Sequence, residues 1–467
     1  MPRFFAGGNV EGYYKTQSGN IKVLFKDTLT PDFLKSLKFL SEDFLNFCNE
    51  NEIIDCVLEK FNLPLRIFKE NGRDGIIIRP FPPQYYFTNG KFMGKLKEGK
   101  WFCSEKLRNK FLSGEQRGSL LNLLKCARNV ASLLYVLQEN KLIIDDLSYE
   151  TLLMNPKDGT IFFIAWDCIH KFDEQSVHFS PLPDFTAPEC IGQRSIYNFP
   201  TVQSNNHALA VLIYMLLFHR HPLRGKRINS ENASLDEELT LGKNALFIEH
   251  PGDKSNDIDT LKLMESELPY GNPKLRPYTM CGQHLHRLFN LAFIEALHIP
   301  QSRPNPKDWI MALDNTISSL IQCNNPHCEE KFFVFREGHN TRVCPYCGCK
   351  STMPIPILNS YTKISENKYH YDNIRYIGRD GLTFYRYQLY GDSSNDLLSI
   401  IRDHISFSIH YKEGNWMIRN LEIPSLVLIS KGHKEILSAN QSALLQEGMK
   451  IVINDVNGKM LYVQMFN

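Results

Sequence analysis

The stretch that decides the fold is residues 142–167, LIIDDLSYETLLMNPKDGTIFFIAWD. It holds three apolar segments that predict strands, Leu142–Ile144, Leu152–Leu153 and Thr160–Ile164. Residues 155–159, Asn-Pro-Lys-Asp-Gly, have the composition of a tight turn, because proline presets φ and glycine accepts a positive φ. A carboxylate, Asp146, stands directly behind the first strand. The sequence therefore predicts a strand, an acidic loop and a hairpin in succession.

Helical patterns flank this stretch on both sides. Residues 116–138 repeat apolar side chains at helical spacing and predict an amphipathic helix. Residues 205–217 are apolar on nearly every side, which predicts a buried helix. Further helices are predicted within 31–60, 283–297 and 309–313. Residues 226–280 are polar and irregular and predict loops.

Composition restricts the class of protein. The chain has 467 residues, enough for two or more domains, with 43% hydrophobic and 22% charged residues, as in ordinary globular proteins. Its 53 basic and 51 acidic residues give no reason to expect a nucleic-acid or membrane partner. No apolar run reaches the roughly 18 residues of a membrane span, and the first residues lack the apolar core of a signal peptide. We expect a cytoplasmic location.

Twelve cysteines are present, and four of them form two close pairs. Cys323 and Cys328 make one pair, Cys344 and Cys347 the other, and each pair stands beside a short apolar segment. Two such pairs are typical of a tetrahedral site with four thiolates, so we predict a structural zinc ion in a zinc ribbon. His327 and Cys349 lie nearby, but a closed site needs only four ligands. We interpret the remaining, scattered cysteines as small buried side chains.

The order of features over residues 1–320 resembles that of protein kinases. The segment 146–151, Asp-Leu-Ser-Tyr-Glu-Thr, stands where the family has Asp-x-x-x-x-Asn, and Ala165-Trp-Asp167 stands where it has Asp-Phe-Gly. Ala187-Pro-Glu189 matches the Ala-Pro-Glu that closes the activation segment. The resemblance implies that Arg303 forms an ion pair with Glu189. It also implies a bilobal fold, with an N-lobe at about 1–85 and a C-lobe at about 86–320.

The same resemblance assigns a nucleotide site to the N-terminal part. Gly8 and Gly12 would belong to a glycine-containing loop over the phosphates, Lys22 would be the nucleotide lysine, and Glu42 its helix partner. Lys26 also qualifies as that lysine. The residues taken by themselves favour an ordinary turn and a surface glutamate, and the alternative for both lysines is that they are solvated.

The chemistry of the site departs from the family. Kinases hold Mg²⁺ at the positions that Thr151 and Ala165 occupy here, and alanine offers no oxygen. Asp146 remains as a candidate base, and Asp167 is a candidate replacement ligand on the same strand face. The resemblance implies ATP and Mg²⁺ as cofactors, but the substitutions favour a pseudokinase. The alternative is a divergent, active Ser/Thr kinase, so enzymatic activity stays open at this point.

Residues 359–467 carry an all-β pattern that resembles a forkhead-associated (FHA-like) sandwich. Members of that family read phosphothreonine with an Arg, a Ser and an Asn, and here only Arg379 is a candidate. We expect a sandwich used for protein contact. The full expectation is a multidomain α+β chain with a kinase-like domain at 1–320, a zinc ribbon at 321–358 and the sandwich at 359–467.

This combination resembles the kinase-like member of bacterial phosphorylation triads of the tellurite-resistance type. The resemblance implies two partners, a von Willebrand A domain protein and a metal-dependent phosphatase. Under the pseudokinase hypothesis the chain recruits both partners. Under the alternative hypothesis it phosphorylates the von Willebrand A protein.

Overall fold

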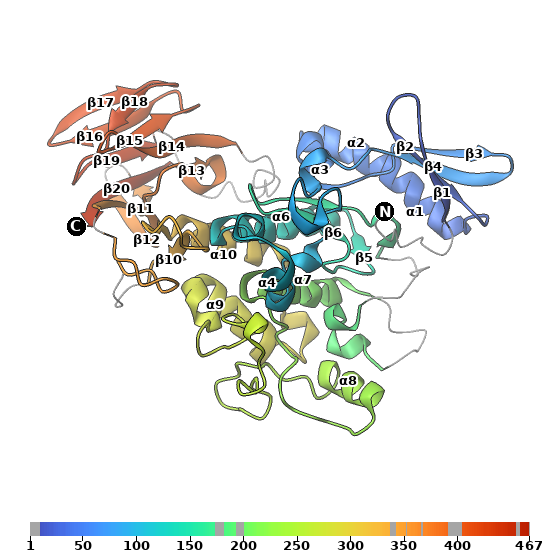
Figure 1. Ribbon diagram of the computed structural model, residues 1–467. Coiled ribbons are helices and arrows are strands. Elements are labelled where there is room, and N and C mark those ends of the chain that lie inside the picture. The colour runs from blue at the N-terminus through green and yellow to red at the C-terminus, as the bar shows by residue number, and fades with distance from the viewer. Residues whose placement is uncertain are drawn as a thin grey trace. The chain divides into compact units, whose positions relative to one another are not determined.

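The structure is a computed structural model that describes residues 10–172, 182–192, 200–336, 342–351, 353–365, 368–390, 404–453 and 458–466. The chain is mixed α/β and divides into two compact units, Met1–Leu313 and Asp314–Asn467. Figure 1 traces both units from blue to red.

The first unit begins with a four-stranded antiparallel sheet in the order β1-β2-β4-β3. Its strands are β1 (Val10–Lys15), β2 (Ile21–Phe25), β3 (Arg66–Glu70) and β4 (Arg73–Ile78). Between β2 and β3 the chain forms helices α1 (Pro31–Ser41), α2 (Asp43–Glu50) and α3 (Ile54–Lys60), so the helical pattern of residues 31–60 is three helices. Phe33 of α1 packs edge to face against Phe25 of β2, with ring centroids 6.3 Å apart. This contact anchors α1 on the sheet.

Two long helices form the centre of the first unit: α6 (Leu120–Glu139) and α7 (Val202–Phe218) (Figure 1). Every residue of α7 from Ser204 to Phe218 is buried, as its uniformly apolar sequence predicts. The predicted helix at 116–138 begins later than expected, because Gly118 has φ +82° and Ser119 caps α6 by accepting from the Asn122 N–H. The helical stretch of residues 114–139 is long and apolar enough to cross a membrane. However, 78% of the apolar 18-residue window within it is buried in the fold, as in a core helix.

The segment that decides the fold lies against these helices. Its strands are β5 (Leu142–Ile144), β6 (Leu152–Asn155) and β7 (Thr160–Phe163), close to the predicted bounds. β6 and β7 pair as an antiparallel hairpin, and Gly159 closes its turn with φ +82°. A Cβ at Gly159 would lie 2.4 Å from the Lys125 side chain, so both space and backbone require glycine there. β5 pairs instead with β8 (Ile169–Lys171). This pairing holds the two ends of the intervening segment, residues 145–168, close together.

The rest of the first unit is helical and irregular. It contains α4 (Glu105–Phe111), α5 (Gly114–Arg117), α8 (Ala233–Leu241), α9 (Gly282–Asn290) and α10 (Pro306–Ser318). The prediction of loops over 226–280 was wrong at α8, where Asn232 caps a helix by accepting from the Leu235 N–H. A single π-type turn, Leu291–Glu295, continues α9. α10 runs across the division between the two units.

The second unit is a sandwich of two antiparallel sheets plus the four-cysteine segment, residues 320–350. One sheet has the order β12-β11-β20-β19-β16-β17, and the other β13-β14-β15-β18. The strands are β11 (Ile355–Ser365), β12 (Lys368–Ile377), β13 (Leu382–Tyr385), β14 (Ile405–Lys412), β15 (Asn415–Asn420), β16 (Leu426–Ser430), β17 (His433–Leu437), β18 (Ser442–Leu444), β19 (Lys450–Ile453) and β20 (Lys459–Phe466). Leu358, Phe384, Phe407 and Ile451 fill the core between the sheets.

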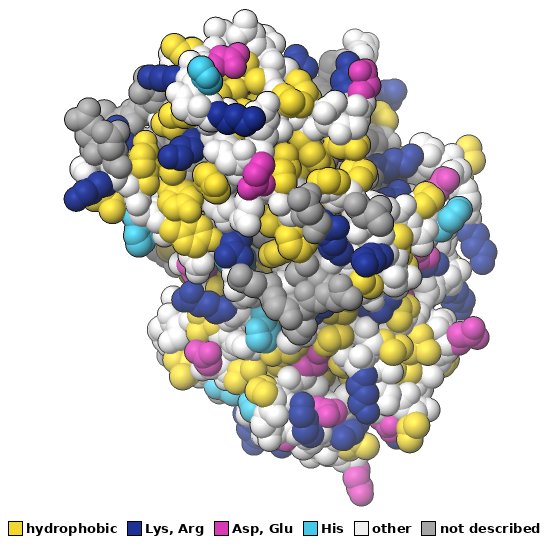
Figure 2. All heavy atoms as spheres, turned by 90° about the vertical axis from the view of Figure 1, so that its left-hand side faces the viewer, with side chains coloured by type: hydrophobic (Ala, Val, Ile, Leu, Met, Phe, Trp, Pro, Cys, Tyr) yellow, Lys and Arg dark blue, Asp and Glu magenta, His cyan; other side chains and the backbone are white. Residues whose placement is uncertain are grey.

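Two features of the second unit differ from the expected pattern. Within the region that carries the all-β pattern, Arg386–Leu389 forms the short helix α11. The sandwich begins at Ile355, inside the segment assigned to the ribbon, because β11 pairs with β20 from Ile355 to Thr362. The predicted turn at Asn457 lies partly outside the described residues. Over the face drawn in Figure 2, basic and acidic side chains are interspersed, in keeping with the near-neutral net charge.

Candidate functional sites

Three aspartates lie together where β5 and β8 meet. Asp145 and Asp146 follow β5, and Asp167 lies in the 3₁₀ turn Trp166–Cys168 that leads into β8. All three are at most 8% exposed. After burial, Asp167, Asp146 and Asp145 in that order raise the pKa of the Cys168 thiol well above its usual range, so all three carboxylates lie near this sulfur. We call Asp145, Asp146 and Asp167 the acidic cluster.

Asn205 of α7 fixes the end of β5. Its amide oxygen accepts from the Ile144 N–H at 2.9 Å, and its amide nitrogen donates to the Ile144 carbonyl at 2.6 Å. The main chain immediately before Asp145 is therefore held by a side chain from a buried helix. The contact of Asn205 with β5 could not be predicted from the sequence, because it depends on how α7 packs against that strand.

Asp146 has a carboxyl group whose pKa is clearly raised. Burial raises its pKa to about 6, against the lowering effect of the Ser148 hydroxyl and the Leu182 backbone N–H. Neither group makes a hydrogen bond of normal geometry to the carboxylate oxygens. Asp146 lines a small pocket of about 20 Å³, together with Thr186 and Ser204. A carboxyl with this pKa can exchange a proton near neutral pH, which a candidate base requires.

Asp145 has a different partner. One of its oxygens lies 2.9 Å from Nδ1 of His170 on β8, and both side chains are less than 8% exposed. Asp145 lines the small pocket as well, so the two aspartates share the pocket while Asp145 also contacts His170. Neither Asp145 nor His170 was predicted as a site residue, and only the position of Asp145 beside Asp146 could have drawn attention to it.

The two positions that the kinase resemblance assigns to metal ligands do not offer a ligand set for Mg²⁺. Thr151 is fully buried, and its hydroxyl donates to the Ser148 carbonyl at 2.8 Å and accepts from the Ser148 N–H at 3.1 Å. Ala165 is 1% exposed and brings only a methyl group. The Thr151 oxygen is therefore used inside its own loop. A magnesium ion held in the family's way does not fit these residues.

Asp167 and its neighbour Trp166 face the N-terminal elements of the same unit. The pKa of Tyr13 on β1 is raised by burial and then by the Asp167 carboxylate, so the phenol lies near that group. Trp166 stacks on Phe33 of α1 and meets Phe25 of β2 edge to face, with ring centroids 6.5 and 6.3 Å away. This turn thus links the acidic cluster to both the sheet and α1.

The residues predicted for a nucleotide site are not brought together by any contact between them. Lys22 forms an ion pair with Glu70 of β3 at 2.7 Å, whereas the resemblance implies Glu42 as its partner. Glu42 is exposed between α1 and α2. Gly12 is a strand residue next to a register shift in the β1–β2 pair. Gly8 lies outside the described residues, and Lys26 is exposed just after β2.

The structure does bring Glu189 and Arg303 together. Two guanidinium nitrogens of Arg303 donate to the two carboxylate oxygens of Glu189, each at 2.7 Å. Arg303 also donates to the carbonyls of Gln203 and Leu297, and its side chain is 1% exposed, while that of Glu189 is 35% exposed. The pair joins the 3₁₀ turn Pro188–Cys190 to α7 and to the loop before α10.

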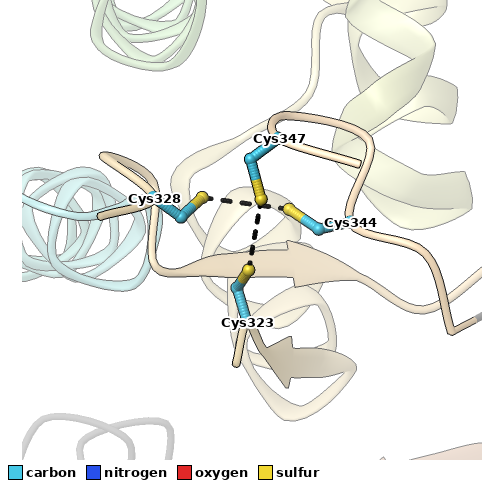
Figure 3. A group of neighbouring side chains, drawn as sticks. All are labelled: Cys323, Cys328, Cys344 and Cys347. Atoms are coloured by element: carbon cyan, nitrogen blue, oxygen red, sulfur yellow. Dashed lines mark hydrogen bonds between the residues drawn. The ribbon is translucent and has the colours of Figure 1, made fainter. Parts of the chain in front are cut away.

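The four predicted cysteines form a compact cluster in the second unit (Figure 3). Their Sγ atoms lie within 4.8 Å of one another, with Cys323 and Cys347 3.5 Å apart and Cys328 and Cys344 3.9 Å apart. Sulfurs bound tetrahedrally to one zinc at about 2.3 Å are about 3.8 Å apart. The cluster therefore has the dimensions of a site for a metal such as zinc. Cys323, Cys328 and Cys344 are buried and Cys347 is exposed.

Backbone N–H groups around this cluster favour thiolates. Burial raises the pKa of Cys344 to about 12, but the N–H groups of Tyr346 and Cys347 lower it by pointing at its sulfur. At Cys347 the effect of burial is outweighed by the Cys349 N–H and by the Asn325 side chain, and the pKa falls to about 7. Such N–H contacts to ligand sulfurs orient and tune metal sites. Cys349 itself donates to the Lys350 carbonyl and is not among the four.

Arg379 follows β12 in the sandwich and is 5% exposed. Burial lowers its pKa to about 10, and the neighbouring Tyr385 raises it. Its terminal Nη1 has no hydrogen-bond partner. The candidate phosphothreonine arginine is therefore directed into the protein.

Comparison of the sequence with protein-family models found no match, and a search of curated proteins also found none.

Proposed function

We propose that this chain is the kinase-like component of a bacterial phosphorylation triad and acts as a pseudokinase scaffold. The observation that carries the proposal is which residues stand at the two positions where the resemblance expects metal ligands. Thr151 uses its hydroxyl within its own loop, and Ala165 has no oxygen. Because phosphoryl transfer depends on positioned metal and charge neutralisation, a site without these ligands loses most of its catalytic power.

A kinase-like fold for the first unit is part of this proposal. It is supported by the succession of the N-terminal sheet, the central helices and the hairpin that follows the acidic segment. The bidentate pair of Arg303 with Glu189 also supports it, since the resemblance implies that contact. The long buried helix α7 and its Asn205 clamp hold the acidic segment in one place.

The second unit would recruit the partners. We propose that its cysteine cluster is a zinc ribbon, because the sulfur separations fit a tetrahedral zinc site. The sandwich of two antiparallel sheets supports an FHA-like domain. Since Arg379 is buried, we propose that this domain contacts protein without reading phosphothreonine. The proposed partners are the von Willebrand A protein and the phosphatase, and the proposed location is the cytoplasm.

One observation favours the second candidate, a divergent active kinase. Asp146 is buried at a cost in stability, and its raised pKa suits proton transfer. Asp167 lies beside it near Cys168 and offers the carboxylate that Ala165 lacks. In that case the substrate would be the von Willebrand A partner.

The test is thermal stabilisation of the full chain by ATP, with and without Mg²⁺ or Mn²⁺. The scaffold proposal expects no metal-dependent stabilisation and no transfer from labelled ATP to the von Willebrand A partner. The double variant Thr151→Asn/Ala165→Asp should gain metal-dependent ATP binding if the surrounding residues still accept the nucleotide. Transfer by the wild type that is abolished in Asp146→Asn and in Asp167→Asn would establish the active-kinase alternative.

A further inference from the structure

The chain's positive charge is concentrated in one segment of the first unit, residues 90–117. This segment has eight Lys and Arg residues against three Glu, whereas the whole chain is nearly balanced at 53 against 51. The remainder of the protein therefore has a small net negative charge. None of the residues of this segment was assigned a role above.

Aromatic side chains cluster within this basic segment. The rings of Phe92 and Trp101 lie 4.3 Å apart, and both meet Phe111 at the end of α4, at 5.5 and 5.8 Å between centroids. All three rings are partly exposed, and the adjacent Met93 is 73% exposed. Aromatic and methionine side chains that stay partly exposed are characteristic of protein interfaces.

Lysine ammonium groups lie over these rings. Lys91 and Lys110 approach the Phe111 ring at 5.5 and 5.3 Å, and Lys95 approaches Phe92 at 5.5 Å. Within the part of the chain that the structure describes, no carboxylate pairs with these three lysines. Lys100, by contrast, pairs with Glu98. The rings hold three uncompensated ammonium groups in position by cation–π contact.

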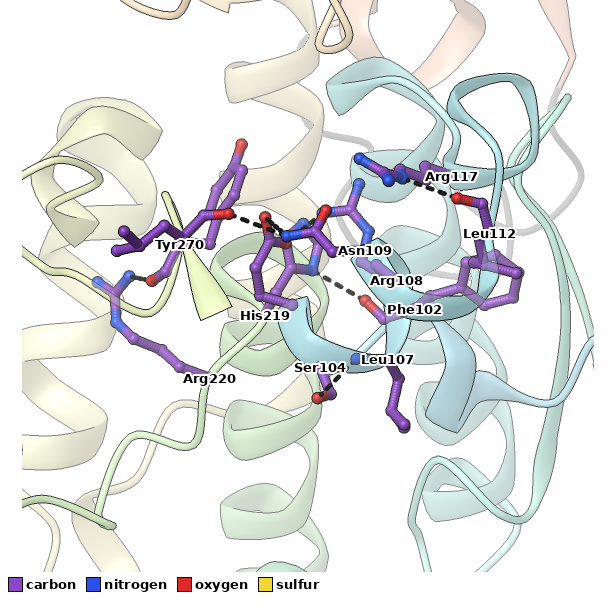
Figure 4. Close-up of polar contacts among 12 residues, drawn as sticks. Phe102, Ser104, Leu107, Arg108, Asn109, Leu112, Arg117, His219, Arg220 and Tyr270 are labelled. Atoms are coloured by element: carbon purple, nitrogen blue, oxygen red, sulfur yellow. Dashed lines mark hydrogen bonds and ion pairs between the residues drawn. The ribbon is translucent and has the colours of Figure 1, made fainter. Parts of the chain in front are cut away.

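A cavity of about 440 Å³ opens at the beginning of α4. Five basic side chains line it, Lys106, Arg220, Arg224, Lys226 and Lys262. Figure 4 shows Ser104, just before α4, and Arg220, which both line the cavity. Ser104 caps α4 there by accepting from the Leu107 N–H, and Arg220 donates to the Tyr270 carbonyl.

The acidic side chains of this cavity are already engaged. Glu105 accepts from Arg108 at 3.1 Å, and Asp259 pairs with Lys262 at 3.3 Å. Glu267 accepts from the Met264 N–H at 2.9 Å. Lys106 and Lys226 remain exposed at the cavity without an acidic partner among the described residues. Arg220 and Arg224 are paired as well, Arg220 with Glu249 and Arg224 with Asp184 and Glu237. The positive charge that the cavity offers to a ligand is therefore that of Lys106 and Lys226.

Helix α4 joins the cavity to the aromatic cluster. Lys106 lines the cavity, and Lys110 is four residues on, which places both on one face of the helix. The positive surface thus continues from the cavity to the rings over a length greater than that of a small anion. We propose that this surface, Lys91, Lys95, Lys106, Lys110 and the cavity, docks an acidic segment of a partner protein.

This inference rests on the proposed scaffold function, because it names the chemistry of the partner that the scaffold recruits. The arrangement favours a peptide over single-stranded nucleic acid, because bases bind by stacking on open ring faces. Here ammonium groups lie over the faces of Phe92 and Phe111. Carboxylates approach such ammonium groups directly, and apolar side chains next to them can contact Met93 and the ring edges.

The test uses the full chain and a fluorescein-labelled oligo-glutamate peptide of about ten residues, measured by anisotropy at low and high salt. We expect binding at low salt that weakens steeply as salt rises, since exposed charge pairs are screened. Lys106→Glu/Lys110→Glu should weaken binding at least about tenfold, and the milder Lys106→Gln/Lys110→Gln by a smaller factor. The matched control is Lys141→Glu/Lys243→Glu, which reverses two exposed lysines of the same unit away from this surface.

Several outcomes overturn the proposal. Equal losses of affinity in the test and control variants would mean that binding reflects general charge attraction. The same conclusion would follow if the peptide bound with equal affinity to the wild type and to both double variants. Tighter binding of an oligothymidine, or of vesicles containing phosphatidylserine, would assign the surface to another class of partner. Full competition by pyrophosphate at micromolar concentration would mark a small-anion site. Because no arm contains ATP or metal, failure here is distinguishable from failure of the pseudokinase proposal.

Discussion

The four-cysteine cluster and the acidic cluster are both groups of potential metal ligands, but they differ in completeness. The four sulfurs lie within 4.8 Å of one another and face backbone N–H groups that favour thiolates. The acidic cluster has three carboxylates, one of them 2.9 Å from His170, and Thr151 and Ala165 occupy the positions that the kinase resemblance assigns to metal ligands. The first cluster is a closed ligand set, and the second is not.

The difference teaches how far a ligand set can be inferred from residue type. Thiolates have few uses in a buried site other than metal binding, so four converging cysteines leave little ambiguity. Buried carboxylates have many uses, and Asp145 and Asp146 already differ in their surroundings. A cluster of carboxylates therefore needs experiments that separate stability from chemistry, whereas the cysteine cluster can be tested by its metal content.

The largest expected effect is the loss of the cysteine site. Cys344→Ser should abolish binding of one zinc per chain, and structural zinc contributes on the order of 10 kcal/mol to small domains that depend on it. The cluster shares its core with Ile355, Ile357 and Ile377 of the sandwich, so part of the loss should reach β11 and β12. Elemental analysis gives the stoichiometry, and limited proteolysis should show cleavage near residues 323–350 with the first unit intact.

The control for this variant is Cys349→Ser, which removes a neighbouring thiol that is not one of the four. It should keep the zinc and the protease resistance. A wild-type protein purified without chelator that contains no zinc would contradict the whole assignment, and so would a Cys344→Ser protein that retains it.

The second effect concerns the ion pair of Arg303 with Glu189. Arg303→Ala removes two charge-assisted bonds to Glu189 and two bonds to carbonyls, and it should destabilise the first unit by about 3 kcal/mol. We place the loss at the lower end of the usual range because the Glu189 side chain is 35% exposed. Arg303→Lys keeps the charge but not the bidentate geometry and should lose roughly half as much. Urea unfolding of both variants measures this, and an unchanged midpoint for Arg303→Ala would contradict the role of the pair.

The third effect is pH-dependent and belongs to Asp146. Its folded pKa of about 6 lies above the value of about 4 expected for an unfolded chain, so the folded state binds the extra proton between these pH values. Stability should therefore fall as pH rises from about 4 to about 6, by roughly 2–3 kcal/mol in total. Asp146→Asn should raise the melting temperature at pH 8 and have little effect near pH 4.

The exposed position Asp55 supplies the control for this titration, because Asp55→Asn removes a carboxylate that is not buried. If Asp146→Asn lowers the melting temperature at pH 8, the carboxylate is stabilised by its surroundings. The prediction that the ionised Asp146 carboxylate destabilises the folded state is then wrong. A gain in stability would instead mean that the protein keeps a costly carboxylate, which is common at functional sites.

The sequence predicted the elements whose signals are local. β5, the β6–β7 hairpin, the burial of α7 and the cysteine cluster all follow from apolar spacing, turn residues or ligand pairs. The partner of Lys22 was missed because Glu70 lies 48 residues further along the chain, and only the sheet order brings β3 near β2 through β4. His170 was missed for a similar reason, since its contact with Asp145 depends on the pairing of β5 with β8. Ligand pairs close in sequence are visible in advance, and side chains brought together by strand pairing are not.

The smallest expected effect separates a surface lysine from a nucleotide lysine. Lys22 pairs with Glu70, and the two side chains are 27% and 44% exposed. Its ammonium group also lies 5.5 Å from the Tyr14 ring. An exposed pair of this kind contributes at most about 1 kcal/mol, so Lys22→Ala should shift the melting temperature only slightly. Glu70→Ala breaks the same pair from the other side and should have an equally small effect.

If Lys22 serves only this pair, neither variant changes the response of the protein to ATP. If Lys22→Ala alone removes a stabilisation by ATP that Glu70→Ala retains, the lysine contacts nucleotide, and the acidic cluster belongs to a more complete site than its ligand positions indicate.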